Sequence, residues 1–296
     1  MDNRKLNIIK IRNFAIWTAI LFGIGMSYIF AIKTKSKAKV EQITIQYGGA
    51  AKGDQLISKK EILNILTKKA KKPLNSSAIS TLDLRAMEAE LNKDERIEKA
   101  DIYIDANNHF NVRIVQKNPI MRVLTNGQDY YIDSEGEQIM VKPGSIAHVP
   151  VVNGVDEAYS KQVFKDATKT SSLKNIFKVL KATKEDEFAN ALIEQATISK
   201  DSLEDIILIP KIGRESIVFG DATNISEKIQ NLKIFYKDGL PKLGWNRYKK
   251  LNLKQGNQVV GTLLNPDMAK VSTPVIKRDS LTAEVLENRK QSSIHH

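Results

Sequence analysis

Residues 96–115, RIEKADIYIDANNHFNVRIV, decide the fold of the first half of the chain. Apolar and polar residues alternate from Ala100 to Asp105 and again from Phe110 to Val115, which is the pattern of half-buried β-strands. The pair Asn107-Asn108 between them is typical of a tight turn. This stretch therefore predicts an antiparallel β-hairpin.

The segments before this hairpin predict one strand and two helices. Residues 40–47 alternate and end at a Gly-Gly pair, which indicates a strand. Ser58 and Glu61 have the spacing of a capping box, which opens a helix whose apolar positions begin at Ile62. A second helix is predicted over residues 82–91. The order is therefore β-α-α-β-β over residues 40–118, and Pro119 is expected to end the unit because proline cannot donate to a strand ladder.

Residues 119–264 predict a second α+β unit, with a mainly antiparallel sheet and helices on one face. The predicted elements are a hairpin at 130–140, an extended piece at 149–154, helices at 160–181 and 184–193, strands at 195–199, 205–210 and 216–220, a helix at 226–239 and a closing hairpin at 247–264. Residues 265–296 lose all periodicity, and we expect a disordered tail there.

The segment from Phe14 to Ile32 contains 19 residues without a charge. A helix needs about 20 apolar residues to cross the hydrocarbon core of a bilayer. Trp17 and Tyr28 lie near the two ends, where aromatic side chains favour the membrane interface. A cleaved signal peptide is the alternative, but its apolar core is typically about 7–15 residues. We therefore expect a retained transmembrane helix over 14–32, after a short tail at 1–13.

The basic charge of the chain surrounds this segment. The formal net charge is +12, and residues 1–39 contribute eight basic residues and one acidic residue, a net of +7. Only 12 − 7 = +5 remains for residues 40–296. Basic residues beside a membrane span favour anionic lipid headgroups, so the charge predicts a membrane and not a nucleic acid. Charge alone does not fix the orientation, because both flanks are basic.

No pattern of catalytic or metal-binding residues appears in the sequence. The chain has no cysteine, which excludes disulfides, thiolate catalysis and cysteine-based zinc sites. His109 and His148 fall beside turns and form no metal-ligand spacing. We therefore expect no enzymatic activity and no cofactor.

Several motifs in this order resemble the cell-division protein family FtsQ/DivIB, and the β-α-α-β-β unit resembles a POTRA (polypeptide-transport-associated) domain. The matching stretches are residues 43–48 and 58–62, residues 96–102 with 112–114, Pro119, the YIDSEG of residues 131–136, Val149-Pro150 with Gly154, residues 225–239, and residues 251–260. Each motif is weak, and their order along residues 10–265 carries the resemblance.

The resemblance implies a non-enzymatic scaffold of the division machinery (the divisome). Such a protein would have a cytoplasmic N-terminus, one span of the inner membrane and a periplasmic domain at the septum. It would link early septal-ring components to FtsB/FtsL-like bitopic proteins and to septal peptidoglycan synthesis, with further divisome partners at the POTRA domain and the transmembrane helix. The alternative is a membrane-anchored POTRA protein in envelope protein translocation or outer-membrane assembly.

The closing hairpin RYKKLNLKQGNQVVGTLL, residues 247–264, is the predicted partner-binding site. We expect its last strand to be a sheet edge that an extended partner segment can join through main-chain hydrogen bonds. The predicted edge residues are Tyr248, Lys249, Lys250, Leu251, Val259, Val260, Gly261 and Thr262. Trp245 is a candidate aromatic anchor for the partner. Two alternatives remain open, namely that the tail after residue 265 covers the edge or that Trp245 belongs to the core.

Overall fold

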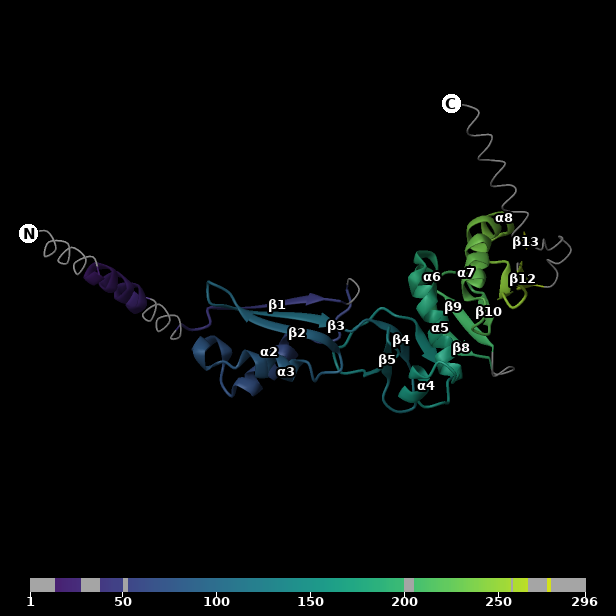
Figure 1. Cartoon of the computed structure of the whole chain (residues 1–296). Helices are drawn as coiled ribbons and strands as arrows, with labels where there is room; N and C mark the ends of the chain where they lie inside the picture. The colour runs from purple at the N-terminus through teal and green to yellow at the C-terminus, as the bar shows by residue number, and fades with distance from the viewer. Residues whose placement is uncertain are drawn as a thin grey trace, which may run out of the picture. The chain divides into compact units, whose positions relative to one another are not determined.

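The computed structural model describes residues 14–27, 38–49, 53–199, 205–256, 258–265 and 276–277. The chain divides into two compact units, one made of residues 1–49 and 57–116, the other of residues 50–56 and 117–296. Figure 1 shows the elements of both units.

The first unit has the predicted β-α-α-β-β order. Its elements are β1 (Gln42–Gly48), α2 (Lys59–Ala70), two short 3₁₀ turns (Leu74–Ser76 and Ile79–Thr81), α3 (Leu84–Leu91), β2 (Ile97–Ile104) and β3 (His109–Gln116). The sheet order is β1-β3-β2, so the last strand is central. It pairs parallel to β1 and antiparallel to β2. This topology explains why residues 96–115 decide the fold, since they supply the centre of the sheet.

Local chemistry fixes both the helices and the hairpin of this unit. The Ser58 hydroxyl accepts a hydrogen bond from the Glu61 N–H at 3.2 Å, and the Glu61 carboxylate accepts one from the Ser58 N–H at 2.9 Å. The capping box is therefore confirmed. Asn108 has a positive φ of 63°, as the turn of the hairpin requires. The core joins Ile62 of α2 to Phe110 of β3, both fully buried.

A buried arginine stabilises the entry to β2. The Arg96 side chain is only 3% exposed. Its Nε and Nη2 atoms donate to the two oxygens of Asp94 at 2.9 Å each, and its Nη1 atom donates to Glu61 at 2.8 Å. One guanidinium therefore joins the capped end of α2 to the segment before β2.

The second unit is built on a sheet of ten strands. The strands are β4 (Pro119–Val123), β5 (Tyr130–Asp133), β6 (Gln138–Met140), β7 (Val151–Asn153), β8 (Ile193–Ile198), β9 (Ile206–Pro210), β10 (Ser216–Gly220), β11 (Tyr248–Asn252), β12 (Gln258–Leu263) and β13 (Ile276–Lys277). Their order in the sheet is β6-β5-β4-β7-β8-β9-β10-β11-β12-β13. Among the described strands the sheet is mainly antiparallel, as predicted, with six antiparallel pairs, but β4–β7, β7–β8 and β10–β11 are parallel. The sheet is therefore mixed, and in two of these pairs helices lie between the paired strands in the sequence.

The helices of this unit are α4 (Lys161–Lys165), α5 (Ser172–Glu185), α6 (Glu187–Leu192), α7 (Ile225–Ile234) and α8 (Leu240–Leu243), with a π-helical turn (Phe235–Gly239) before α8. Helices α5, α6 and α7 contact one another beside strands β8 to β10 (Figure 1). Their apolar side chains share one buried cluster with the strands, including Ile176 and Ile229. The opposite face of β5 carries a smaller cluster of Leu56, Tyr131 and Ile139.

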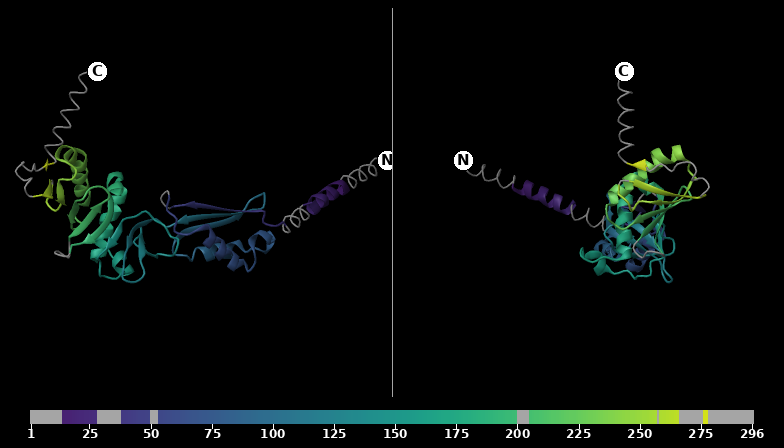
Figure 2. Two further views of the ribbon diagram at one scale, coloured as in Figure 1. Left: turned by 180° about the vertical axis from the view of Figure 1, so that it is seen from behind. Right: turned by 90° about the vertical axis from the view of Figure 1, so that its right-hand side faces the viewer.

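Strand residues lie at both predicted boundaries. Pro119 follows β3, the last strand of the first unit, and is also the first residue of β4, where the missing N–H of proline is tolerated. The tail at 265–296 is not wholly without structure, because Ile276–Lys277 forms β13. Figure 2 shows β12 and β13, in yellow-green and yellow, at one end of the sheet.

Residues 14–27 form a helix whose large apolar side chains are exposed, among them Phe14 and Trp17. Within the part of the chain that the structure describes, no helix is long and apolar enough to span a bilayer. Tyr28 and Ile32, the other two residues of the predicted anchor, lie outside the described residues.

Candidate functional site

The closing hairpin forms the last part of the sheet, but only one of its strands lies near the edge. Strand β11 lies between β10, to which it is parallel, and β12, to which it is antiparallel. The register of β11 and β12 shifts between Tyr248 and Lys250, which places a bulge at Lys249. Both lysines are consequently exposed, although they are neighbours in one strand.

The predicted edge residues separate into two groups. Tyr248, Leu251 and Val259 are buried at 2%, 0% and 5% exposure and belong to the core of the second unit. Tyr248 and Leu251 lie on the interior strand β11, and the Val259 side chain of β12 faces the core, so none of these three side chains is accessible to a partner. The residues that remain accessible are Lys249, Lys250, Val260 and Thr262, with Gly261 half-buried between the last two.

Gly261 is required by the ring of Tyr248. A Cβ atom at Gly261 would lie only 2.4 Å from two ring carbons of Tyr248. The same ring makes an edge contact with Phe235, at 5.6 Å between centroids. The Tyr248 ring therefore packs the hairpin against the helical layer. Only glycine at position 261 leaves room for this ring.

The solvent face of β12 carries a short apolar row. Val260 and Leu264 are 39% and 48% exposed, and the exposed Thr262 lies between them. Lys250 lies directly opposite Thr262 on β11. The alternation of residues 260, 262 and 264 already contained the signal for Leu264, which the sequence-based interpretation did not include.

Trp245 does not belong to the core. It is 46% exposed, and its ring makes an edge contact with Tyr236 at 6.2 Å between centroids. The hydroxyl of Tyr236 in turn donates to the carboxylate of Glu215, and both residues are buried. Burial and this carboxylate raise the pKa of Tyr236 above its usual range. The exposed indole of Trp245 therefore packs against the buried side chain of Tyr236.

The edge of β12 is partly covered by the chain itself. Strand β13 pairs antiparallel with it, Gln258 opposite Lys277 and Val259 opposite Ile276. The prediction of a fully vacant edge is therefore wrong, and coverage by the tail holds for two residues. Among the described residues, β13 pairs with residues 258 and 259 of β12.

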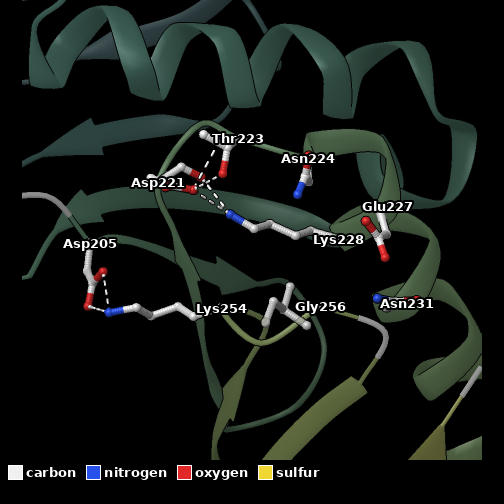
Figure 3. Close-up of a pocket in the computed structure, with 10 residues that line it drawn as sticks. Asp205, Asp221, Thr223, Asn224, Glu227, Lys228, Asn231, Lys254 and Gly256 are labelled. Atoms are coloured by element: carbon white, nitrogen blue, oxygen red, sulfur yellow. Dashed lines mark hydrogen bonds and ion pairs between the residues drawn. The ribbon is translucent and has the colours of Figure 1, made fainter.

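A polar pocket of about 240 Å³ lies between the start of α7 and the turn after β11 (Figure 3). Lys228 and Asp221 form an ion pair at 2.8 Å, and Lys254 and Asp205 form another at 3.0 Å. The Lys228 ammonium lowers the pKa of Asp221 to about 2. These four charges neutralise one another in pairs, and the Glu227 carboxylate also lines the pocket. In the described ranges, no group of three or more acidic, histidine or cysteine side chains could hold a metal ion.

Comparison with known families agrees with this architecture. Residues 41–115 match the POTRA-like domain, which defines the class as a POTRA-containing protein. Residues 118–262 match the family described as FtsQ/DivIB, C-terminal related. The two matches together support the FtsQ/DivIB family, as the motifs predicted, and indicate a role in cell division. No curated protein matches the chain significantly.

Proposed function

We propose that this protein is a non-enzymatic scaffold of the divisome that captures an extended segment of a partner protein on strand β12. The proposed partners are FtsB/FtsL-like bitopic proteins, through which the scaffold would connect early septal-ring components to septal peptidoglycan synthesis. The POTRA unit and the N-terminal helix would serve other divisome partners. The proposal rests on the family of the chain together with the accessible part of β12.

The edge of β12 supports this proposal through its chemistry. Exposed strand edges offer unpaired backbone donors and acceptors, and proteins usually cover or charge them. Here the row of Val260, Thr262 and Leu264 has no charged side chain of its own, Lys250 lies directly opposite Thr262, and Arg247 is next to Leu264. A partner strand would gain main-chain hydrogen bonds from the edge and side-chain contacts from this row. Trp245, nearly half exposed, would add an aromatic contact.

The membrane part of the proposal rests on the N-terminal helix. Eight large apolar side chains of residues 14–27 are exposed: Phe14, Ile16, Trp17, Ile20, Leu21, Phe22, Ile24 and Met26. Burying them in lipid would remove a large apolar surface from water. We propose that residues 14–32 anchor the protein in the inner membrane, with residues 1–13 in the cytoplasm and both units in the periplasm at the septum.

Substitution of the apolar row tests the capture site without breaking the sheet. The Leu264 N–H donates to the Arg247 carbonyl at 2.9 Å, so alternate residues of β12, including Val260, direct their N–H groups towards β11. Proline at Val260 would therefore damage the fold as well as the edge. The double variant Val260→Lys with Leu264→Lys keeps every N–H and adds charge to the edge. Ile212→Lys is the matched control, since Ile212 is 63% exposed on the same unit.

The measurement is photo-crosslinking in dividing cells, with a crosslinking amino acid at Thr262, to co-expressed FtsB-like and FtsL-like proteins. We expect a crosslink that the double lysine variant loses and Ile212→Lys retains. Deletion of residues 266–296 removes β13 and should increase the crosslink, because the partner no longer competes with it. A fluorescent fusion should lie at midcell, and depletion should give filaments. An unchanged crosslink in a folded double variant would refute capture on β12, whereas a uniform envelope signal with normal division would refute the divisome role.

A further inference from the structure

A second pocket lies near the other end of the ten-stranded sheet, far from β12 in strand order. Strands β4 and β7 are parallel neighbours, so their carboxyl ends lie side by side. From these ends the chain continues to β5 on one side and towards α4 on the other. Diverging connections of this kind leave a crevice outside the strand ends. The crevice here has a volume of about 650 Å³, and we name it the 124–159 pocket.

The pocket is lined by side chains from three places in the sequence. They are Leu124, Thr125, Asn126 and Gln128 after β4, Tyr130 and Gln138 on β5 and β6, and residues 153–159 at and after β7. This set contains carboxamides, carboxylates and two tyrosines, and it contains neither lysine nor arginine. In a chain with a net charge of +12, such a lining stands out as acidic.

Tyr130 is the buried side chain of this pocket whose hydroxyl lacks a partner. It is 5% exposed, and its ring makes an edge contact with Tyr159 at 6.1 Å between centroids. The Tyr159 hydroxyl donates to the Gly136 carbonyl at 2.8 Å. Among the residues that the structure describes, none forms a hydrogen bond with the Tyr130 hydroxyl. The Tyr130 side chain is buried, but its hydroxyl is not fully enclosed, so a ligand in the pocket can reach it as a hydrogen-bond partner.

The charge of the pocket is held in place by helix α5. The Oε1 atom of Glu157 accepts a hydrogen bond from the Leu173 N–H in the first turn of this helix. Burial, and next the carboxylate of Glu157, raise the pKa of Tyr130, and both residues line the pocket. Asp156, the neighbouring carboxylate, is exposed and forms no ion pair with any described residue. The pocket therefore carries two negative charges and an unused hydroxyl oxygen.

We propose that the 124–159 pocket binds a basic side chain, arginine or lysine, presented by an extended peptide of a protein partner. The two carboxylates and the phenol oxygen accept hydrogen bonds from a guanidinium or ammonium group, and such charge-assisted bonds are the strong ones. The rings of Tyr130 and Tyr159 add the possibility of cation–π contact, which favours the same ligand. Phosphates and nucleic acids are disfavoured, because the lining offers them no cation. This site is separate from β12 and does not depend on the proposed capture there.

The test is a titration of the full-length protein in detergent with N-acetyl-arginine amide, followed by amide NMR shifts. The control ligand is N-acetyl-citrulline amide, which has nearly the same shape and no charge. We expect saturable shifts at residues of the pocket, Gly154 among them, and binding of citrulline weaker by about tenfold, or about 1.4 kcal/mol. Equal binding of the two ligands, or binding of N-acetylglucosamine alone, would overturn the proposal.

Two variants locate the binding. Glu157→Gln removes the charge but keeps an oxygen for the Leu173 N–H, and it should weaken arginine binding by about tenfold. Tyr130→Phe keeps the ring and should weaken binding by a smaller factor. Glu194→Gln, an exposed position outside the lining, removes the same charge and should change nothing. If Glu157→Gln, with an unchanged circular dichroism spectrum, binds arginine as well as Glu194→Gln does, the assignment is wrong.

Discussion

Replacing Arg96 by methionine should destabilise the first unit by about 3 kcal/mol. The substitution keeps most of the apolar stem and removes the guanidinium, which is buried and makes hydrogen bonds of 2.8–2.9 Å to Asp94 and Glu61. The Asp94 carboxylate, itself 9% exposed, then loses its countercharge. The helix cap loses its connection to β2 at the same time.

The size of this loss depends on the hydrogen bonds that the Asp94 and Glu61 carboxylates keep after the substitution. Removing one partner of a buried ion pair costs about 3–5 kcal/mol. Asp94 still accepts the Arg96 N–H at 3.1 Å, and Glu61 still accepts the Ser58 N–H, so the lower end applies. Arg96→Lys keeps the charge without the planar fork and should cost less than methionine. Arg85→Met is the matched control, because Arg85 is exposed on α3, and it should cost under about 0.5 kcal/mol.

Hydrogen exchange measured by mass spectrometry separates the two units within the full chain. At about 1.4 kcal/mol per tenfold, a loss of about 3 kcal/mol lowers the protection of the β2 and β3 amides by about two orders of magnitude. Protection of β8 and β9 in the second unit should not change. If Arg96→Met and Arg85→Met gave the same protection in β2 and β3, the buried network would not stabilise the unit and the reasoning would fail.

Two further predictions concern the second unit. Gly261→Ala should destabilise it by about 1–3 kcal/mol, because the added methyl group overlaps the Tyr248 ring; Gly256→Ala, with open space around it, should be nearly neutral in urea unfolding. Glu137 should contribute stability that acid removes. A hydrogen bond from Lys161 is the largest cause that lowers its pKa, from 4.5 to about 2. The contribution is thus complete above the unfolded value and is lost as the pH falls through the folded one. Urea midpoints between about pH 5 and pH 3 should fall less steeply in Glu137→Gln than in the parent, and identical slopes would contradict this assignment.

The first unit could be predicted almost completely because its signals are local. The capping box at Ser58 and the alternation of residues 97–116 each need fewer than about ten neighbouring residues to be recognised. The paired asparagines mark the turn between the strands without reference to the rest of the chain. The sheet order agrees with this local pattern, because the central strand β3 has alternating buried residues.

The second unit was harder because its pairings are distant in sequence. Strand β4 was missed since it is short, starts at Pro119 and lies between partners that the sequence does not reveal. Tyr248 and Leu251 were taken for edge residues because the parallel pairing of β11 with β10 crosses a helix. The pairing of β13 could not be predicted either, because two residues carry no periodicity.

The parallel pairing of β10 and β11 also has a consequence for the order of folding. Residues 221–247, which include α7, separate the two strands, so β11 cannot reach β10 until this connection has closed. An isolated two-stranded hairpin is marginally stable in water, and distant pairings form slowly because loop closure comes first. We expect β11 and β12 to be among the last elements to gain protection during refolding. A partner that recognises β12 would then bind only chains whose second unit is completely folded. Incompletely folded copies would therefore not enter the assembly, even without a chaperone or protease that removes them.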